Sequence, residues 1–479
     1  MLALVIAMAL PGGAVGAPKA HPKHATKQPP GTLVQLVGAR GCLVASSKGA
    51  KGAPQSVRPA PSGGSSGCGS ARALEGPGPF MGSRAIAISP DGDNVYVASS
   101  RSNAIAIFAR HSQTGALTQP AGTDGCIAAK GVDGCAPAIG LNGPNSLAIS
   151  PDGRNVSATS RGSNAIAVFV RNRTSGALHQ LPGLEGCVSG LPVPGCASGR
   201  ALLGPDVVVI SPDGTNVYVG SFFGNAVAVF SRGSGGGLTQ PTGSAGCVAE
   251  STASGCAAGF ALGAPEGMAI SRDGSSVYVA TALSNAVLTL SRDTSTGALA
   301  QATDGSGCIA NSSLGGCATG VQLSGANAVA VSPRKGNVYV TSLSSNSVTA
   351  FSHAASGAGL AQLPGTSGCV VYLRSVGCSF GRAMVAPEGL AVSPDGANVY
   401  TAAFGTGAID VLNRRPKSGA LFQKPGPAGC AAPRSVPGCS PGRALRGASS
   451  IAISADGKYL YATAFGSNAV DVFGIRRRK

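Results

Sequence analysis

The stretch Ala-Ile-Ser-Pro-Asp-Gly-Asp-Asn-Val-Tyr-Val-Ala, residues 87–98, decides the fold because it joins two short apolar runs through an Asp-Gly turn. This arrangement predicts a β-hairpin, since glycine accepts the positive φ that such turns need. A repeat of about sixty residues predicts stacked supersecondary units. Variants of the turn begin at seven serines, separated by 61 residues with one step of 60: Ser89, Ser150, Ser211, Ser271, Ser332, Ser393 and Ser454.

Each repeat unit has the pattern of four short strands and no helix. In the second unit these strands are expected at 146–149, 155–158, 164–169 and 177–180. Near-continuous Ala, Val and Ile runs fit strands that are buried on both faces between neighbouring sheets. Four strands in seven copies predict an all-β fold, a seven-bladed β-propeller with four-stranded blades.

The order of the strands predicts how the ring closes. The first three strands of a unit occur seven times, and the last copy runs from 451 to 473. The outer strand also occurs seven times, but its first copy comes early, at 31–35, in the same register as 115–119. The N-terminal strand is therefore expected to complete the last blade, which removes the open sheet edges.

The chain divides into four expected segments. Residues 2–10 are apolar and are followed by small residues, which predicts a signal peptide over 1–17, although no Lys or Arg precedes the apolar run. The run is too short to span a membrane, so the mature chain is expected to have no span. A basic linker over 18–30, the propeller over 31–474 and a basic tail over 475–479 follow.

The fourteen cysteines form seven sequence pairs, and six of the pairs share the spacing Gly-Cys-x8-Gly-Cys. An even count tied to the repeat predicts disulfides in an oxidising compartment, so the protein is expected to be secreted or to lie in the cell envelope. Pairing within each loop is the prediction, and bridges between neighbouring blades are the alternative. No His accompanies the pairs, so no metal is expected. The pairs are Cys42/Cys68, Cys126/Cys135, Cys187/Cys196, Cys247/Cys256, Cys308/Cys317, Cys369/Cys378 and Cys430/Cys439.

The formal charge is +17, with 36 Lys and Arg against 19 Asp and Glu. A basic excess can point to nucleic acid, anionic lipid or an acidic wall polymer. No stacking aromatic motif, recognition helix or Arg stripe accompanies it, so nucleic acid is not favoured. Solubility and loose adhesion to anionic surfaces is the preferred interpretation.

An asparagine opens the third strand of six units, and Gly407 takes its place in the remaining one. Repetition in nearly every blade favours a structural role, in which the side chain bonds loop backbone. The asparagines are Asn103, Asn164, Asn225, Asn285, Asn346 and Asn468.

A more informative position lies five residues before each turn serine, where the chain enters the innermost strand at the mouth of the central channel. It stays polar but varies, which a purely structural position should not do. Three carboxylates on a basic protein suggest a site for a cation or a polyhydroxylated ligand, and the alternative is a solvated rim. Its occupants are Arg84, Asn145, Asp206, Glu266, Asn327, Glu388 and Ser449.

Two motifs carry a family resemblance over about residues 31–474. Residues 87–98 resemble the YVTN-type repeat, and Ser-Arg-Asp-Thr-Ser-Thr-Gly-Ala-Leu at 291–299 resembles the seven-bladed lactonase family, which includes 6-phosphogluconolactonase-like enzymes. The resemblance implies the propeller fold and, for those enzymes, His, Arg and Glu near the channel. No His of this chain falls on an expected inner strand, and the cysteine loops depart from the family.

The sequence therefore supports two functions. The first is an exported binding or scaffold propeller that recognises a glycan, a wall polymer or a protein through the face carrying the cysteine loops. The second is a lactonase-like hydrolase or isomerase, in which Glu266 and Glu388 act as acid and base and Arg84 steadies an oxyanion. Neither requires a cofactor.

Overall fold

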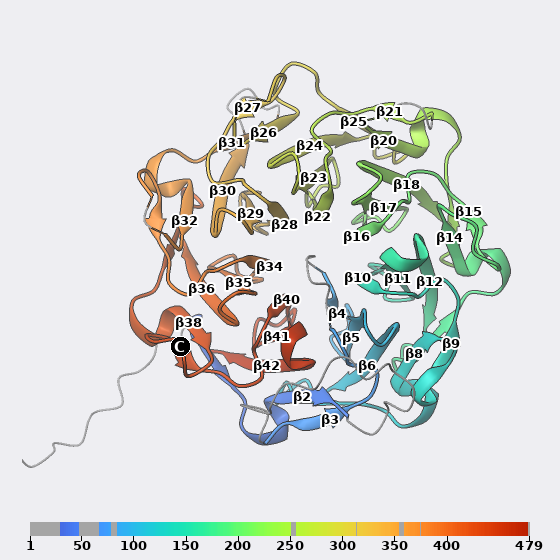
Figure 1. Ribbon diagram of the computed structural model, residues 1–479, viewed down its shortest axis with the longest axis horizontal. Coiled ribbons are helices and arrows are strands. Elements are labelled where there is room, and N and C mark those ends of the chain that lie inside the picture. The colour runs from blue at the N-terminus through green and yellow to red at the C-terminus, as the bar shows by residue number, and fades with distance from the viewer. Residues whose placement is uncertain are drawn as a thin grey trace, which may run out of the picture.

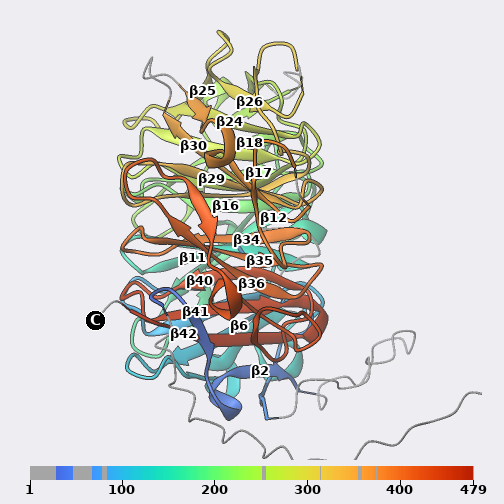
Figure 2. The same ribbon diagram turned by 90° about the vertical axis from the view of Figure 1, so that its left-hand side faces the viewer.

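The computed structural model describes residues 29–46, 67–77, 84–250, 255–312, 314–353, 359–373 and 375–477. Seven sheets stand around a central axis, as the sequence predicts (Figure 1). Figure 2 shows the molecule at right angles to this view, with β2 beside strands from the other end of the chain. The expected signal peptide and nearly all of the basic linker lie outside the described residues.

Three strands form the inner part of every blade as an antiparallel meander. The innermost strands are β4 (Ile86–Ile88), β10 (Pro144–Ile149), β16 (Pro205–Ile210), β22 (Pro265–Ile270), β28 (Ala326–Val331), β34 (Pro387–Val392) and β40 (Ala448–Ile453). The second strands are β5 (Asn94–Ser99), β11 (Asn155–Ser160), β17 (Asn216–Ser221), β23 (Ser276–Thr281), β29 (Val338–Ser342), β35 (Asn398–Ala403) and β41 (Tyr459–Ala464). The third strands are β6 (Ala104–Arg110), β12 (Ala165–Arg171), β18 (Ala226–Arg232), β24 (Ala286–Arg292), β30 (Ser347–His353), β36 (Ala408–Arg414) and β42 (Ala469–Ile475).

The outer part of each blade contains more strands than the sequence predicts. The expected fourth strand pairs only with the C-terminal half of the third, as β13 does with β12. The fourth strands are β1 (Leu33–Gln35), β7 (Leu117–Thr118), β13 (Leu178–Gln180), β19 (Leu238–Thr239), β25 (Leu299–Gln301), β31 (Leu360–Gln362) and β37 (Leu421–Gln423).

The first half of each cysteine loop then pairs with the N-terminal half of the third strand, and the second half adds a parallel strand outside it. The fifth strands are β2 (Cys42–Ala45), β8 (Cys126–Ala129), β14 (Cys187–Ser189), β20 (Cys247–Ala249), β26 (Cys308–Ala310), β32 (Cys369–Val371) and β38 (Cys430–Ala432). The sixth strands are β3 (Gly69–Ala71), β9 (Ala136–Ala138), β15 (Ala197–Ser198), β21 (Ala257–Ala258), β27 (Ala318–Thr319), β33 (Ser379–Phe380) and β39 (Ser440–Pro441). The seven-bladed architecture is confirmed, whereas the prediction of four strands per blade was wrong, because the cysteine loops themselves join the sheets, which have six strands each.

Short 3-10 turns lie in the loops that connect these strands. They are η1 (Gly38–Arg40), η2 (Gly122–Gly125), η3 (Val132–Gly134), η4 (Arg161–Ser163), η5 (Gly183–Gly186), η6 (Gly243–Gly246), η8 (Gly365–Ser367), η9 (Gly426–Gly429) and η10 (Phe465–Ser467). The described part of the chain has no helix that is long and apolar enough to cross a membrane.

The two ends of the chain meet in the seventh blade. β1 pairs with β42, with Leu33 opposite Ile475, and β2 pairs with the other half of β42. In Figure 1 the red strands β40 to β42 accordingly lie beside the blue strands β2 and β3. The seventh and first blades are joined in turn by a hydrogen bond from the Gly76 amide to Asn468 Oδ1, 2.8 Å long.

The fourteen cysteines form seven disulfides within their own loops, so the alternative of bridges between neighbouring blades was wrong. Each bond joins the start of a fifth strand to a residue just before the sixth strand of the same blade. No described cysteine is free. Seven disulfides indicate an extracellular or periplasmic location. The bonds are Cys42–Cys68, Cys126–Cys135, Cys187–Cys196, Cys247–Cys256, Cys308–Cys317, Cys369–Cys378 and Cys430–Cys439.

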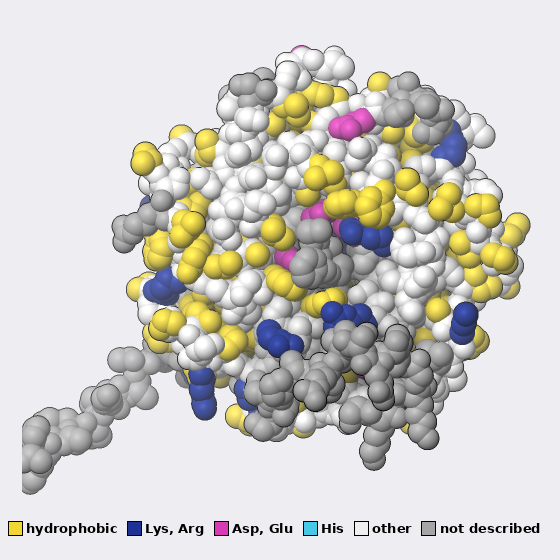
Figure 3. All heavy atoms as spheres, viewed as in Figure 1, with side chains coloured by type: hydrophobic (Ala, Val, Ile, Leu, Met, Phe, Trp, Pro, Cys, Tyr) yellow, Lys and Arg dark blue, Asp and Glu magenta, His cyan; other side chains and the backbone are white. Residues whose placement is uncertain are grey.

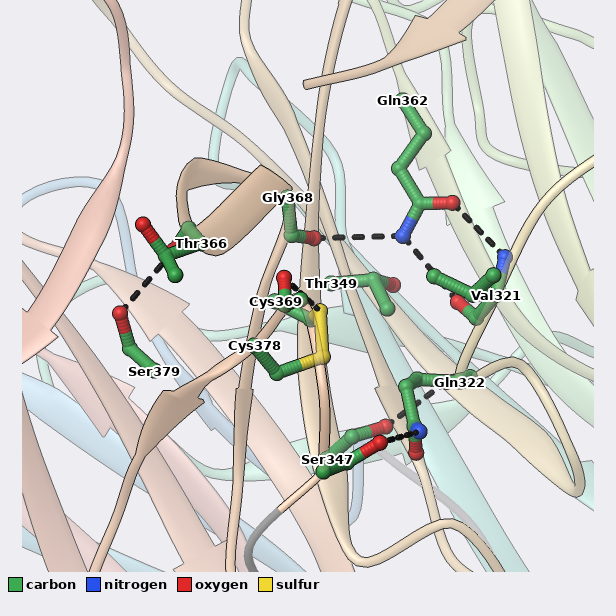
Figure 4. The surroundings of a disulfide bond; sticks show 12 residues. Val321, Gln322, Ser347, Thr349, Gln362, Thr366, Gly368, Cys369, Cys378 and Ser379 are labelled. Atoms are coloured by element: carbon green, nitrogen blue, oxygen red, sulfur yellow. Dashed lines mark hydrogen bonds between the residues drawn. A yellow bond between two sulfur atoms is a disulfide. The ribbon is translucent and has the colours of Figure 1, made fainter. Parts of the chain in front are cut away.

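The disulfides hold the two outermost strands together. Figure 4 shows the pair Cys369–Cys378, which holds β33 parallel to β32. Cys196, Cys256 and Cys317 occupy the place of Cys378 in the second, third and fourth blades. Gln362 donates to the Val321 carbonyl and accepts from its amide, so the loop leading into the blade is fixed as well.

The core lies between neighbouring blades rather than within one layer. Each of the seven larger clusters of buried side chains draws on two blades; one of them joins Leu43 and Val470 of the seventh blade to Val95 and Phe108 of the first. Tyrosines of the second strands and phenylalanines of the third are fully buried there. Because every blade is covered on both sides, its strands need not alternate between apolar and polar residues.

Candidate functional site

The central channel is apolar along the strands that line it. Its volume is about 500 Å³, and the lining includes Ile88, Leu147, Val209 and Ile270 of the innermost strands. Arg84 lies at one end and Pro90 and other turn residues lie at the opposite end. The variable polar position of the repeat lies at the start of the innermost strands, on the face to which the cysteine loops lead, and of its seven described residues Arg84 is the one that lines the channel.

The cysteines contribute structure to this face and no side chain to the channel. None of the fourteen is among the residues that line it. Cys196, Cys256 and Cys317, like their counterparts in the other blades, lie in disulfides at the outer edge of the sheets. They therefore hold together the outermost strands of the sheets, away from the channel.

A β-bulge sets the geometry of this mouth in six blades. The pairing of the two inner strands shifts across Asn145, Asp206, Glu266, Asn327, Glu388 and Ser449. A bulge leaves one residue without a partner in the ladder and re-aims its side chain, and bulges are over-represented next to active sites. The variable position of the repeat is thus the bulged residue at the start of the innermost strand in six blades.

The side chains at these six bulges are all buried, which does not fit the alternative of a solvated rim. Arg84, at the corresponding place in the first blade, is half-buried. A buried polar side chain costs free energy unless it is hydrogen-bonded. The hydrogen-bond partners of these side chains therefore show which of the residues have a structural role and which are candidates for ligand binding or catalysis.

The uncharged members are paired with a threonine across the hairpin. Thr341 donates to Asn327 Oδ1 at 2.8 Å, and Thr159 donates to Asn145 Oδ1 at 3.1 Å. The hydroxyls of Ser449 and Thr463 lie 3.0 Å apart. Burial with a local partner is what a structural residue requires.

The acidic members have no such partner. The residues across the hairpin are Gly220 for Asp206, Ala280 for Glu266 and Ala402 for Glu388, none of which has a polar side chain. Neither oxygen of Glu388 has a hydrogen-bond partner among the described residues, although the residue is only 1% exposed. The repeat therefore satisfies the uncharged copies locally, whereas the Glu388 carboxyl group is buried without a hydrogen-bond partner among the described residues.

The three carboxyl groups perturb one another. Burial, and then the charge of Asp206, raise the pKa of Glu266 to about 8. Burial, and then the charges of Glu266 and Asp206, raise the pKa of Glu388 well above its ordinary value. At neutral pH Glu266 is therefore mainly a neutral carboxylic acid, which donates one hydrogen bond and accepts others.

Asp206 is the member that holds a charge at neutral pH. Its Oδ1 accepts from Arg161 at 2.6 Å and from Asn145, while burial raises its pKa to about 6 in spite of these bonds. The cation beside the carboxyl groups is thus Arg161, in the turn between the second and third strands of blade two, which the sequence did not single out. Arg84 forms no ion pair with any acidic side chain in the described residues.

Aromatic and aliphatic side chains flank the mouth on the same turns. Phe223 is 60% exposed and Leu283 is 69% exposed. The Arg161 guanidinium lies 4.5 Å from the centre of the Phe222 ring, and that of Arg101 lies 4.2 Å from the Phe465 ring. In Figure 3, acidic side chains lie near the centre of the face, with basic and hydrophobic side chains around them.

The repeated asparagines have the structural role that the sequence predicts. Each accepts, on Oδ1, a backbone amide of the loop that leads into the next blade; for five of them the donor lies about forty positions later, and for Asn468 it is Gly76 near the other end of the chain. Each also adopts the left-handed conformation that asparagine tolerates, with φ between 44° and 51°. These residues connect blades and do not form a separate site.

The geometry does not resemble a metal centre. Among the residues that the structure describes, no group of three or more His, Cys, Asp or Glu side chains converges closely enough to hold an ion. The mouth is better described as two neutral or nearly neutral carboxyl groups, an Asp–Arg pair and an apolar surround. Such a set of convergent polar groups within an apolar frame is typical of sites for uncharged organic ligands.

Comparison with known proteins gives information on the fold alone. No protein-family model matches the chain. No curated protein matches it either. Hydrazine synthase of Kuenenia stuttgartiensis is similar in structure, with a TM-score of 0.51 and 17% identity over 84% of this chain and 98% of that one.

Two other solved propellers are similar at lower scores. A putative 6-phosphogluconolactonase from Bacteroides uniformis has a TM-score of 0.48 and 18% identity, over 77% of this chain and 87% of that one. A periplasmic gluconolactonase from Pseudomonas aeruginosa has a TM-score of 0.45 and 19% identity, over 71% and 83%. At such identities the likeness concerns the seven-bladed architecture alone, and the activity has to be argued from the site.

Proposed function

We propose that this protein is an exported binding propeller that takes a polyhydroxylated ligand, a glycan, at the channel mouth on its cysteine-loop face. One observation carries the proposal. The uncharged Asn and Ser copies of the bulge residue contact a Thr hydroxyl of the neighbouring strand, whereas the buried carboxyl group of Glu388 has no hydrogen-bond partner among the described residues. The Glu388 carboxyl group therefore lacks the local partner that the uncharged copies have.

A glycan supplies what these groups need. Sugar hydroxyls both donate and accept hydrogen bonds, and a protonated carboxyl group does the same. The Glu388 carboxyl has no partner within the described fold, so hydrogen bonds from a ligand would remove the penalty of burying it. Phe223 and Leu283 offer exposed apolar surface beside the mouth, against which the C–H face of a sugar ring can pack.

The proposal is tested by titrating a panel of neutral oligosaccharides into the wild-type protein and measuring the heat of binding. Glu388→Ala is expected to weaken binding at least tenfold, and Glu388→Gln much less, because the amide keeps a donor and an acceptor. Asp410→Ala serves as the control, since Asp410 is a buried carboxyl group in the third strand of the same blade. Equal affinity in wild type and Glu388→Ala would contradict the proposal.

A second candidate, a lactonase-like hydrolase, is favoured by the raised pKa of Glu266, because a general acid must carry its proton near the operating pH. In such a reaction water adds to the acyl carbon, the ring C–O bond breaks, and the carboxyl group gives its proton to the leaving oxygen and takes one back from the added water. Arg161 rather than Arg84 then lies beside the carboxyl groups.

The Gln variants separate the two functions. Changing Glu266 and Glu388 to Gln removes the exchangeable proton of each carboxylic acid but keeps the hydrogen bonds. Hydrolysis of a lactone panel that is abolished in this double variant, with ligand binding retained, identifies a hydrolase. Binding without turnover in either protein identifies a binding module.

A further inference from the structure

The seam between the sixth and seventh blades differs from the others on the cysteine-loop face. At the other six seams an asparagine accepts the amide of the loop leading into the next blade, as Asn346 accepts that of Ala386 at 2.7 Å. The sixth blade has Gly407 at this position, with φ +63°. A Cβ atom there would lie 2.6 Å from the Leu445 carbonyl oxygen, so the approaching loop leaves room for glycine alone.

This seam also lacks an arginine cross-link on the opposite face. At four other seams the last residue of the third strand is an arginine that donates to a tyrosine of the preceding blade. The seventh blade has Ile475 there, and Asn398 Oδ1 of the sixth blade has no partner among the described residues. The seam keeps the bonds between Gln35 and the Arg443 backbone and between Tyr400 and the Gly31 carbonyl.

A groove of about 760 Å³ follows this seam on the cysteine-loop face. Its walls are residues 35–38 of the N-terminal segment, the turn 404–407, part of the loop between Cys430 and Cys439, and the loop 441–447. The groove is larger than the channel, at about 500 Å³, and falls within the size range of ligand sites. It therefore lies where one inter-blade contact has been replaced by open space.

The groove is basic. Arg434, Arg443 and Arg446 line it, and no acidic side chain is among its lining residues. Arg443 Nη2 donates to the carbonyls of Leu36 and Gly38, and Arg446 donates to that of Gly466, so both guanidinium groups are held in position. Arg434 is exposed. Fixed guanidinium groups are suited to bind carboxylate or sulfate through paired N–H groups.

We propose that this groove is a second ligand site, which binds an acidic saccharide carrying carboxylate or sulfate groups. The arginines supply the charge, and Phe404, which lines the groove, supplies a ring against which a sugar can pack. The site uses none of the carboxyl groups of the channel mouth, so it is separate from the function proposed above. The groove is expected to prefer acidic saccharides and the mouth neutral ones, because the groove is basic and the mouth is acidic.

The test measures the affinity of a galacturonate oligomer and of a sulfated oligosaccharide, with an uncharged oligosaccharide of equal length beside them. The double variant Arg434→Gln/Arg446→Gln is expected to weaken both acidic probes at least tenfold. Arg154→Gln/Arg173→Gln removes the same charge at two exposed positions that do not line the groove, and it is expected to have little effect.

Several results would overturn the proposal. Equal losses in the two double variants would show that the probes respond only to the net charge of +17. Equal affinity for the uncharged oligosaccharide, or no binding of either acidic probe, would show that the groove has no anion site. Loss of acidic binding in Glu388→Ala would place the ligand at the channel mouth instead. Failure of neutral glycans to bind would leave this site unaffected.

Discussion

Arg171 of the second blade donates from Nε to the hydroxyl of Tyr96 in the first blade, with 2.8 Å between the two atoms. The same guanidinium group forms an ion pair with Asp91, in the Ser-Pro-Asp-Gly turn of the first blade. Arg110, Arg292 and Arg414 bond Tyr461, Tyr218 and Tyr339 in the same way. The turn that decides the fold therefore also supplies the acceptors that hold neighbouring blades together.

Removing one of these hydroxyls should destabilise the ring. Tyr96→Phe leaves Arg171 Nε without its partner in a buried place, so we expect the free energy of unfolding to fall by about 1–3 kcal/mol. Chemical denaturation with the disulfides intact measures the change. Tyr278→Phe is the matched control: its neighbour in the next blade is His353, so its hydroxyl receives no bond from an arginine, and a much smaller loss is expected.

The strands and the ring closure could be predicted because each depends on a local pattern that recurs seven times. The fifth and sixth strands of each blade could not. Segments such as Cys126–Ala129 and Ala136–Ala138 are short, and their pairing depends on the disulfide between Cys126 and Cys135 and on the third strand beside them. Short elements fixed by tertiary contacts lie beyond what local propensity indicates.

The repeat also made part of the candidate site predictable from the sequence. Comparing the seven copies isolated the polar, variable position, because a repeat shows which residues depart from the structural norm. Two facts could not be read from it: that the position is a buried bulge, and that Arg161 in a turn of the preceding blade forms an ion pair with Asp206. One signal was available in the sequence. Thr159, Thr341 and Thr463 occur fourteen residues after Asn145, Asn327 and Ser449, and no Thr follows the acidic copies at that distance.

Stability should fall as the pH rises from about 4 to about 8. Burial is the largest cause that raises the pKa values of Asp206, Glu266, Glu388, Asp410 and Asp471. Below the pKa of the unfolded state both states hold the proton, whereas at higher pH only the folded state does, so folding must take up protons. Within this window each such group lowers the free energy of unfolding by up to about 1.4 kcal/mol per pH unit.

The melting temperature at pH 5 and at pH 8 measures this dependence. Glu266→Gln is expected to reduce the difference between the two values, because the amide does not titrate and the pKa of Glu266 is about 8. The turn aspartates do not interfere: hydrogen bonds and an arginine lower the pKa of Asp152, for example, to about 2, which lies outside the window. A melting temperature that rises from pH 5 to pH 8 would contradict the prediction.

Each disulfide should stabilise the fold mainly through the loop that it closes. Cys126 and Cys135 are nine residues apart, for which the chain-entropy relation gives about 2–3 kcal/mol. Cys42 and Cys68 are 26 residues apart, for which it gives about 3–4 kcal/mol. Replacing each pair by alanines and comparing denaturation midpoints tests the order. Equal losses would show that strain or residual structure, rather than loop length, sets the contribution.

At the seam between the sixth and seventh blades, the stabilising effect of the inter-blade arginine can be tested by introducing one. Asp395, Asn398 and Tyr400 of the sixth blade occupy the positions that receive an arginine elsewhere, but Ile475 stands in the arginine's place, and Asn398 Oδ1 has no partner among the described residues. Ile475→Arg should supply that partner. A hydrogen bond from a charged donor contributes about 1.5–3 kcal/mol, which exceeds the loss from exposing part of a half-buried isoleucine. We expect a higher melting temperature.

The comparison with Ile475→Gln separates the effect of arginine hydrogen bonds between the blades from the effect of a polar side chain in general. Glutamine is polar but lacks the fork of donors, so it should lower the melting temperature where arginine raises it. Arg414→Ile makes the reverse change at the seam between the fifth and sixth blades, where Arg414 bonds Tyr339 and Asn337, and it should lower the melting temperature. If Ile475→Arg destabilised the protein as much as Ile475→Gln, the packing of Ile475 beside Leu33 would matter more than the missing arginine. The weak seam would then follow from joining the N-terminal strand to the last blade rather than from a lost contact.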